Sequence, residues 1–94
     1  MKIKNLIWLD EIVEELIKKH NVTQHEVRDV LQSNPHFRFV EKGHRRGENV
    51  YSAMGKTHNG RYLIIFFVFK TNGQALILSA RDMTKSERKL YEKA

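Results

Sequence analysis

The sequence contains no cysteine and one proline, and its longest uninterrupted apolar stretch covers only eight residues, Tyr62 to Phe69. Without cysteine the chain has no disulfide, no thiolate metal ligand and no cysteine nucleophile. Eight apolar residues are far fewer than the ~17–25 that a membrane-spanning helix needs. The N-terminal residues soon turn acidic and include no small-residue cleavage site, so we expect no signal peptide, a cytoplasmic location and no membrane partner.

The motifs of several enzyme classes are also missing. The five histidines form neither a His-Glu-x-x-His pattern nor a tight cluster with carboxylates. There is no Gly-x-Ser-x-Gly turn to carry a serine nucleophile, and no glycine-rich loop to hold a phosphate. We therefore expect no metal and no cofactor, and the chemistry that remains open is metal-free chemistry on a phosphodiester.

Charge is plentiful but unevenly placed along the 94 residues, which suffice for a single domain spanning 1–94. Residues 1–35 carry five basic and six acidic side chains, whereas residues 36–94 carry twelve basic and five acidic ones. A basic half of this kind predicts a polyanion or an acidic protein as partner, although a solvated basic surface would look the same. Rings that could stack on unpaired bases lie among its cations, namely His36, His44, His58, Tyr51 and Tyr62.

The hydrophobic pattern predicts two helices, four strands and a final helix. Apolar residues at helical spacing follow Asp10, and Thr23-Gln24-His25-Glu26 is a capping box that opens a second helix ending before Pro35. Alternating segments from His36 onward are joined by two Asn-Gly turns, and Thr84-Lys85-Ser86-Glu87 opens the last helix. The predicted fold class is α+β, with a four-stranded, largely antiparallel sheet.

Two-residue Asn-Gly turns also predict the pairing of the strands. Asn59-Gly60 places Val50 opposite Phe69, and Asn72-Gly73 places Phe69 opposite Leu76. Together with Phe67 and Leu78, these residues are predicted to share one face of the sheet. Ala53 and Gly55 are predicted on the other face, as a seat for closely packed helices.

Cleavage of RNA by its own 2′-hydroxyl needs a base, a proton donor and cations around the phosphate. His44-Arg45-Arg46, in a loop bounded by glycines, is the most site-like group, although a solvated basic turn would have the same sequence. For Arg81, an ion pair with Asp82 or Glu87 is as plausible as a phosphate contact. The predicted catalytic residues are His44, Arg46, Arg61 and Arg81. The predicted RNA-binding residues are Lys42, Arg45, Tyr51, Lys56 and His58.

The second half of the chain resembles the BrnT family of type II toxins. The resemblance rests on Arg46-Gly47-Glu48, Tyr51, Gly55 and Asn59-Gly60-Arg61, and continues through Ser79-Ala80-Arg81 to Thr84, Glu87 and Tyr91. It implies a RelE-like fold, a ribonuclease activity, and an antitoxin encoded nearby as partner. Many members of the family carry arginine at the positions of Val50 and Leu76 and a polar residue near that of Phe69, whereas all three are apolar in this sequence.

Two functions are therefore open. One is a metal-independent endoribonuclease toxin, and the other is a non-catalytic binding module that keeps the toxin fold and its protein partner. The apolar row favours a protein interface, because exposing several large apolar side chains on a small monomer is costly. That interface would serve a homodimer, or the antitoxin in a toxin–antitoxin heterotetramer. Its predicted residues are Val50, Phe67, Phe69, Leu76 and Leu78.

Overall fold

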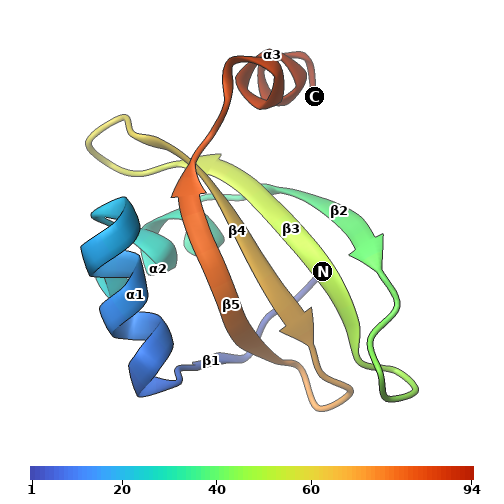
Figure 1. The fold of residues 1–94 in the computed structure, drawn as a ribbon. Coiled ribbons are helices and arrows are strands. Elements are labelled where there is room, and N and C mark those ends of the chain that lie inside the picture. Colours follow the sequence, from blue (N-terminus) through green and yellow to red (C-terminus); the bar gives the residue numbers. More distant parts are fainter.

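The computed structural model describes residues 1–94 and contains three helices and one five-stranded sheet (Figure 1). The elements are β1 (Asn5–Ile7), α1 (Asp10–His20), α2 (Gln24–Gln32), β2 (His36–Glu41), β3 (Asn49–Lys56), β4 (Tyr62–Phe69), β5 (Gln74–Asp82) and α3 (Lys85–Lys93). The predicted α+β class and the three helices are confirmed, but four strands is one too few. The extra strand, β1, has three residues and pairs with distant β5, so no local sequence pattern marks it.

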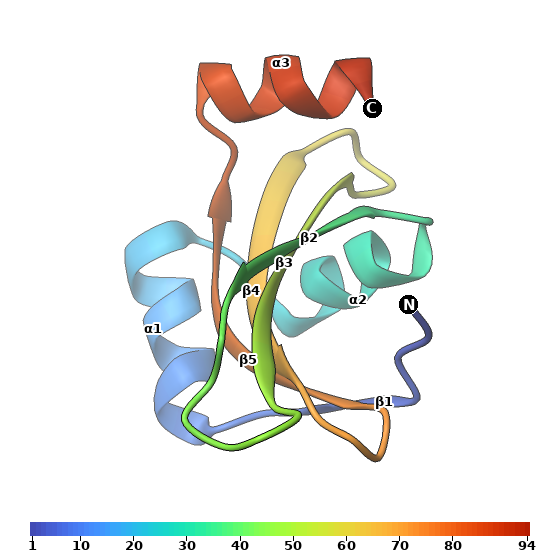
Figure 2. The same cartoon turned by 90° about the vertical axis from the view of Figure 1, so that its right-hand side faces the viewer.

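The sheet has the order β1-β5-β4-β3-β2, with β1 parallel to β5 and every other pair antiparallel. Figures 1 and 2 show α1 and α2 on one side of the sheet and α3 beyond one end of it. The core lies between the sheet and the first two helices and is entirely aliphatic except for Phe67. Gly55 confirms the predicted helix seat, because a Cβ there would lie only 3.0 Å from Val30 Cγ1 on α2.

Both predicted capping boxes are present. The Thr23 hydroxyl oxygen accepts a hydrogen bond from the Glu26 amide, and the Glu26 carboxylate accepts one from the Thr23 amide. Thr84 and Glu87 repeat the arrangement at α3. These exchanges satisfy amides that the first turn of a helix otherwise leaves unpaired. None of the three helices is long and apolar enough to cross a membrane.

The predicted strand register is wrong by one residue across β3 and β4. Each Asn-Gly belongs to a three-residue loop, because Gly60 and Gly73 adopt positive φ angles of 85° and 89° as the last loop residue. Lys56 therefore pairs with Tyr62 and Val50 with Val68, not with Phe69. A shift of one residue moves every side chain of one strand to the opposite face relative to its partner.

The faces differ from the prediction accordingly. Phe67 is fully buried in the core, and Phe69 packs against that core on the helix side of the sheet. Val50, Val68 and Leu76 form a continuous row of paired residues on the other side. The predicted interface is thus wrong for Phe67 and Phe69, which the structure places beneath the helices.

Two irregularities in the ladder change which side chains reach that other side. In β2, Phe39 pairs with Tyr51 and Glu41 pairs with Val50, so Val40 is an extra residue. In β5, Leu78 is the extra residue between the Ser79 and Ile77 pairs. Bulges of this kind bend a strand and redirect its side chains.

Candidate functional site

The face of the sheet turned away from α1 and α2, here called the open face, carries most of the candidate residues. At one end α3 lies over it, since Tyr91 packs edge-on against Tyr62 and the Arg88 guanidinium stacks 3.8 Å above the same ring. At the other end it is bounded by the loop of residues 42–48 between β2 and β3. The open face therefore runs from a short helix to a basic loop.

Backbone contacts hold the 42–48 loop in place. Gly43 lies so close to the carbonyl of Glu48 that an added Cβ would fall 1.7 Å from its oxygen. The Glu48 amide donates to the carbonyl of Arg45, and Lys70 donates to the Glu48 carboxylate over 2.7 Å. That hydrogen bond from Lys70 holds the pKa of Glu48 below its ordinary value. The Glu48 carboxylate is therefore charged and already paired with an ammonium group.

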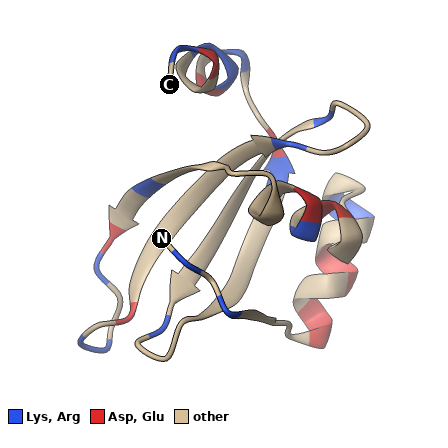
Figure 3. Ribbon diagram, turned by 180° about the vertical axis from the view of Figure 1, so that it is seen from behind, with Lys and Arg blue, Asp and Glu red and all other residues tan.

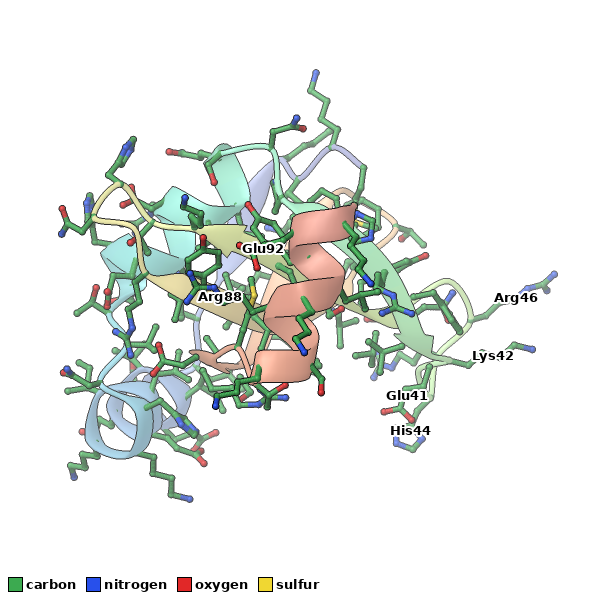
Figure 4. All side chains as sticks on the ribbon, turned by 90° about the horizontal axis from the view of Figure 1, so that it is seen from above. Glu41, Lys42, His44, Arg46, Arg88 and Glu92 are labelled. Atoms are coloured by element: carbon green, nitrogen blue, oxygen red, sulfur yellow. The ribbon has the colours of Figure 1, made fainter.

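Four cations lie on β2 and in the loop that follows it. All are exposed, and none donates a side-chain hydrogen bond or forms an ion pair in the structure. Arg38 faces Ser52 from β2, and the other three belong to the loop, where Figure 4 shows Lys42 and Arg46 extending away from the sheet. Figure 3 shows the basic loop and the acidic α1 at opposite sides of the molecule. The four are Arg38, Lys42, Arg45 and Arg46.

A hollow of about 400 Å³ lies beside these cations. Its floor is apolar and comes from three strands, whereas its rim comes from the loop and the end of β2. The floor residues are Val50, Val68, Leu76 and Leu78, and the rim residues are Glu41, Gly43, His44, Arg45 and Glu48. Val50, Leu76 and Leu78 thus lie on an accessible face, as predicted. Val68 and Glu41 line the same hollow and were not predicted there.

The second predicted group of polar residues lies at the other end of the sheet. Lys56 ends β3 and His58 lies in the next loop, so the eight residues of β3, about 26 Å of chain, separate them from the 42–48 loop. The Lys56 ammonium lies 5.1 Å from the centre of the Tyr62 ring. His58 donates its amide to Asp29 and holds its Nε2 3.4 Å from the same carboxylate. Lys56 and His58 therefore form a group separate from the basic loop.

Arg61 has a structural role. Its guanidinium donates to the carbonyls of His20 and Asn21 at 2.8 and 2.6 Å, and to the carboxylates of Glu26 and Asp82. These bonds use all five N–H groups of an arginine side chain. The bond from Arg61 lowers the pKa of Asp82, and the same contact raises the pKa of Arg61. Arg61 joins α1, α2 and β5, and we leave it out of the site.

Arg81 is held by Glu87 but keeps free donors. Two of its N–H groups donate to the Glu87 carboxylate at 2.7 and 3.0 Å, and a third donates to the Asp82 carbonyl. Its guanidinium lies 5.6 Å from the centre of the Phe66 ring, on the open face. The hydrogen bond from Arg81 lowers the pKa of Glu87. The ion pair expected as one alternative is present, and a phosphate contact stays a prediction.

Tyr51 belongs to the helix side of the sheet. Its ring stacks on Phe67 at 6.2 Å and meets Phe39 and Phe69 edge-on. Tyr51 thus shares a face with Ala53 and Gly55, as predicted, and its contact with RNA stays a prediction. Sequence reasoning also passed over Glu41 and Val68, whose positions depend on a bulge and a register that no local pattern reveals.

Comparison of the sequence with known protein families identifies one family over most of the chain. Residues 8–87 match the family described as BrnT, the ribonuclease toxin of type II toxin–antitoxin systems. No curated protein matches the chain. The structure contains no group of three or more histidine and carboxylate side chains placed to hold a metal ion. Because the match covers most of the 94 residues, the chain belongs to the BrnT family of ribonuclease toxins.

Proposed function

We propose that this toxin is an endoribonuclease that cleaves single-stranded RNA by attack of the RNA's own 2′-hydroxyl, without a metal ion. The observation that carries the proposal is the set of four unpaired cations beside His44 at the end of the open face. Such cations bind successive phosphates, whereas the paired Arg61 and Lys70 cannot do so without losing internal contacts. Membership of a type II system implies a cognate antitoxin as partner.

The reaction follows from these groups. In our proposal His44 accepts the proton of the 2′-hydroxyl, the 2′-oxygen forms a bond to phosphorus, and the bond from phosphorus to the 5′-oxygen breaks. A proton returns to the leaving oxygen, and the products are a 2′,3′-cyclic phosphate and a free 5′-hydroxyl. Arg45 and Arg46 stabilise the negative charge that develops on the phosphoryl oxygens, and Lys42 and Arg38 hold the flanking phosphates. Arg81 offers its free N–H groups farther along the same face.

The second candidate is a binding module without activity, and one observation favours it. The resemblance implies arginine at the positions of Val50 and Leu76, but the structure has an apolar row there. A protein that lacks those arginines could lose RNA cleavage and still bind its antitoxin through the same fold. A cytoplasmic location and a homodimer or toxin–antitoxin heterotetramer are also part of the proposal, and sizing of the purified proteins tests the assembly.

The experiment compares RNA cleavage by the wild type, His44→Ala, Arg46→Ala and Lys18→Ala in the presence of a chelator. Lys18→Ala is the control, because Lys18 lies on α1 and forms no ion pair. This substitution removes one positive charge far from the open face. We expect the wild type and Lys18→Ala to leave 2′,3′-cyclic phosphate ends, and the other two variants to lose activity with unchanged unfolding curves. Intact RNA with every protein, together with normal growth on expression, would favour the binding module.

A further inference from the structure

The hollow on the open face has a chemical character that the proposed cleavage reaction does not explain. Cleavage needs cations and a base, whereas this hollow has an apolar floor of four aliphatic side chains and a carboxylate on its rim. Its volume of about 400 Å³ lies in the range of small-molecule sites, roughly 300–1,000 Å³. Proteins that take up a single base hold it against aromatic or apolar side chains and recognise its edge by hydrogen bonds.

Glu41 is the carboxylate on the rim that has no partner. Its exposed side chain forms no hydrogen bond or ion pair, although four cations surround this end of the sheet. The other carboxylate on the rim, Glu48, is already occupied by Lys70. Figure 4 shows Glu41 beside His44, while Lys42 and Arg46 extend in another direction. A free acceptor therefore lies at the mouth of the hollow.

The bulge in β2 is what brings Glu41 to this face. With regular pairing after Phe39, Val40 would oppose Val50 and Glu41 would project from the opposite face of the sheet. Because Val40 is the extra residue, Glu41 lies directly across from Val50, which is part of the floor. A charge on an edge strand also discourages aggregation. That purpose needs no bulge, since Arg38 on β2 and Lys42 directly after it already supply charge at this edge.

We propose that the hollow binds a guanine base of single-stranded RNA, with Glu41 accepting hydrogen bonds from its N1–H and 2-amino groups. A carboxylate has two acceptor oxygens and no donor, and guanine alone among the four bases presents two adjacent donors on its Watson–Crick edge. The base lies on Val50, Val68 and Leu76. This inference rests on the proposed function for the RNA, but the pocket is testable without cleavage.

The test measures binding of 3′-GMP, 3′-IMP and 3′-AMP by calorimetry. Inosine lacks the 2-amino group of guanine, and adenine also lacks the N1–H donor. We expect 3′-GMP to bind about tenfold tighter than 3′-IMP, as for one charge-assisted hydrogen bond of about 1.4 kcal/mol, and tighter still than 3′-AMP. In Glu41→Gln this preference disappears, because the amide that replaces the carboxylate has only one acceptor oxygen.

The charge-matched control is Glu11→Gln in the first turn of α1, where the carboxylate is exposed and unpaired. It should keep the preference for 3′-GMP. Equal affinity for the three nucleotides would overturn the guanine site, and cleavage of RNA in the same preparation would leave the ribonuclease proposal standing. Conversely, selective binding of 3′-GMP by a protein that leaves RNA intact supports the site and rejects the activity.

A protein occupant of the hollow gives a different result. If a second copy or the antitoxin covers it, the wild type elutes as a dimer or complex, and Leu78→Arg, which narrows the hollow, dissociates that assembly. A wild-type assembly that Leu78→Arg dissociates, together with equal affinity of the wild type for the three nucleotides, would overturn the guanine site. A wild-type monomer whose preference for 3′-GMP is lost in Leu78→Arg supports it.

Discussion

Arg61 offers the sharpest test of the assignment of the arginines, because the structure gives it a purely structural role. Replacing Arg61 with Met keeps the aliphatic stem and removes bonds to the His20 and Asn21 carbonyls and to two carboxylates. Each carbonyl bond is worth about 1 kcal/mol, and each partly exposed ion pair contributes less than about 1 kcal/mol. We expect Arg61→Met to lower the free energy of unfolding by about 3 kcal/mol.

For a domain of this size such a loss lowers Tm by about 12–24 °C, which circular dichroism measures directly. The matched control is Arg46→Met, since Arg46 is exposed and unpaired and its replacement should change stability by less than about 0.5 kcal/mol. At a temperature where both variants are folded, Arg61→Met should retain the RNA affinity of the wild type and Arg46→Met should bind RNA more weakly. Unchanged stability of Arg61→Met with loss of RNA binding would refute the structural role.

Three further predictions follow from the same contacts. Phe69→Arg should destabilise the protein by about 2–4 kcal/mol in urea unfolding, because Phe69 packs on the core. Leu78→Arg should change the free energy of unfolding by less than about 1 kcal/mol, because Leu78 is exposed. Equal effects of the two substitutions would contradict the observed register. Because Arg81 lowers the pKa of Glu87, the stability from this pair is fully present above the ordinary value of 4.5 and is lost as the pH falls through the lower folded value. The Tm difference between wild type and Arg81→Met should accordingly shrink below that pH. RNA affinity should fall with a log–log salt slope of about −3, as for four phosphates on a single strand, and a flat salt dependence would exclude the four cations as phosphate ligands.

The elements that local physics controls were predictable from the sequence. Thr23 with Glu26 and Thr84 with Glu87 start helices by satisfying their first amides, and both capping boxes lie where the sequence placed them. Apolar alternation predicted the four longer strands, and Gly55 marked where a helix approaches the sheet. The basic loop was also predictable, because glycine and arginine at 43–47 belong to one continuous segment.

The arrangement of the site was decided by contacts between distant residues. An Asn-Gly pair fits a two-residue or a three-residue loop, and the choice at Gly60 moved Phe69 from the open face to the core. Arg61 has the sequence context of a free cation, but its partners on α1, α2 and β5 are up to 41 residues away along the chain. The sequence by itself determined the helices, the strands and the charge of the loop, because these depend on neighbouring residues. Only the tertiary structure decided that Glu41 faces Val50 and that Arg61 is occupied, because pairing between strands and burial of ion pairs depend on residues that the sequence keeps apart.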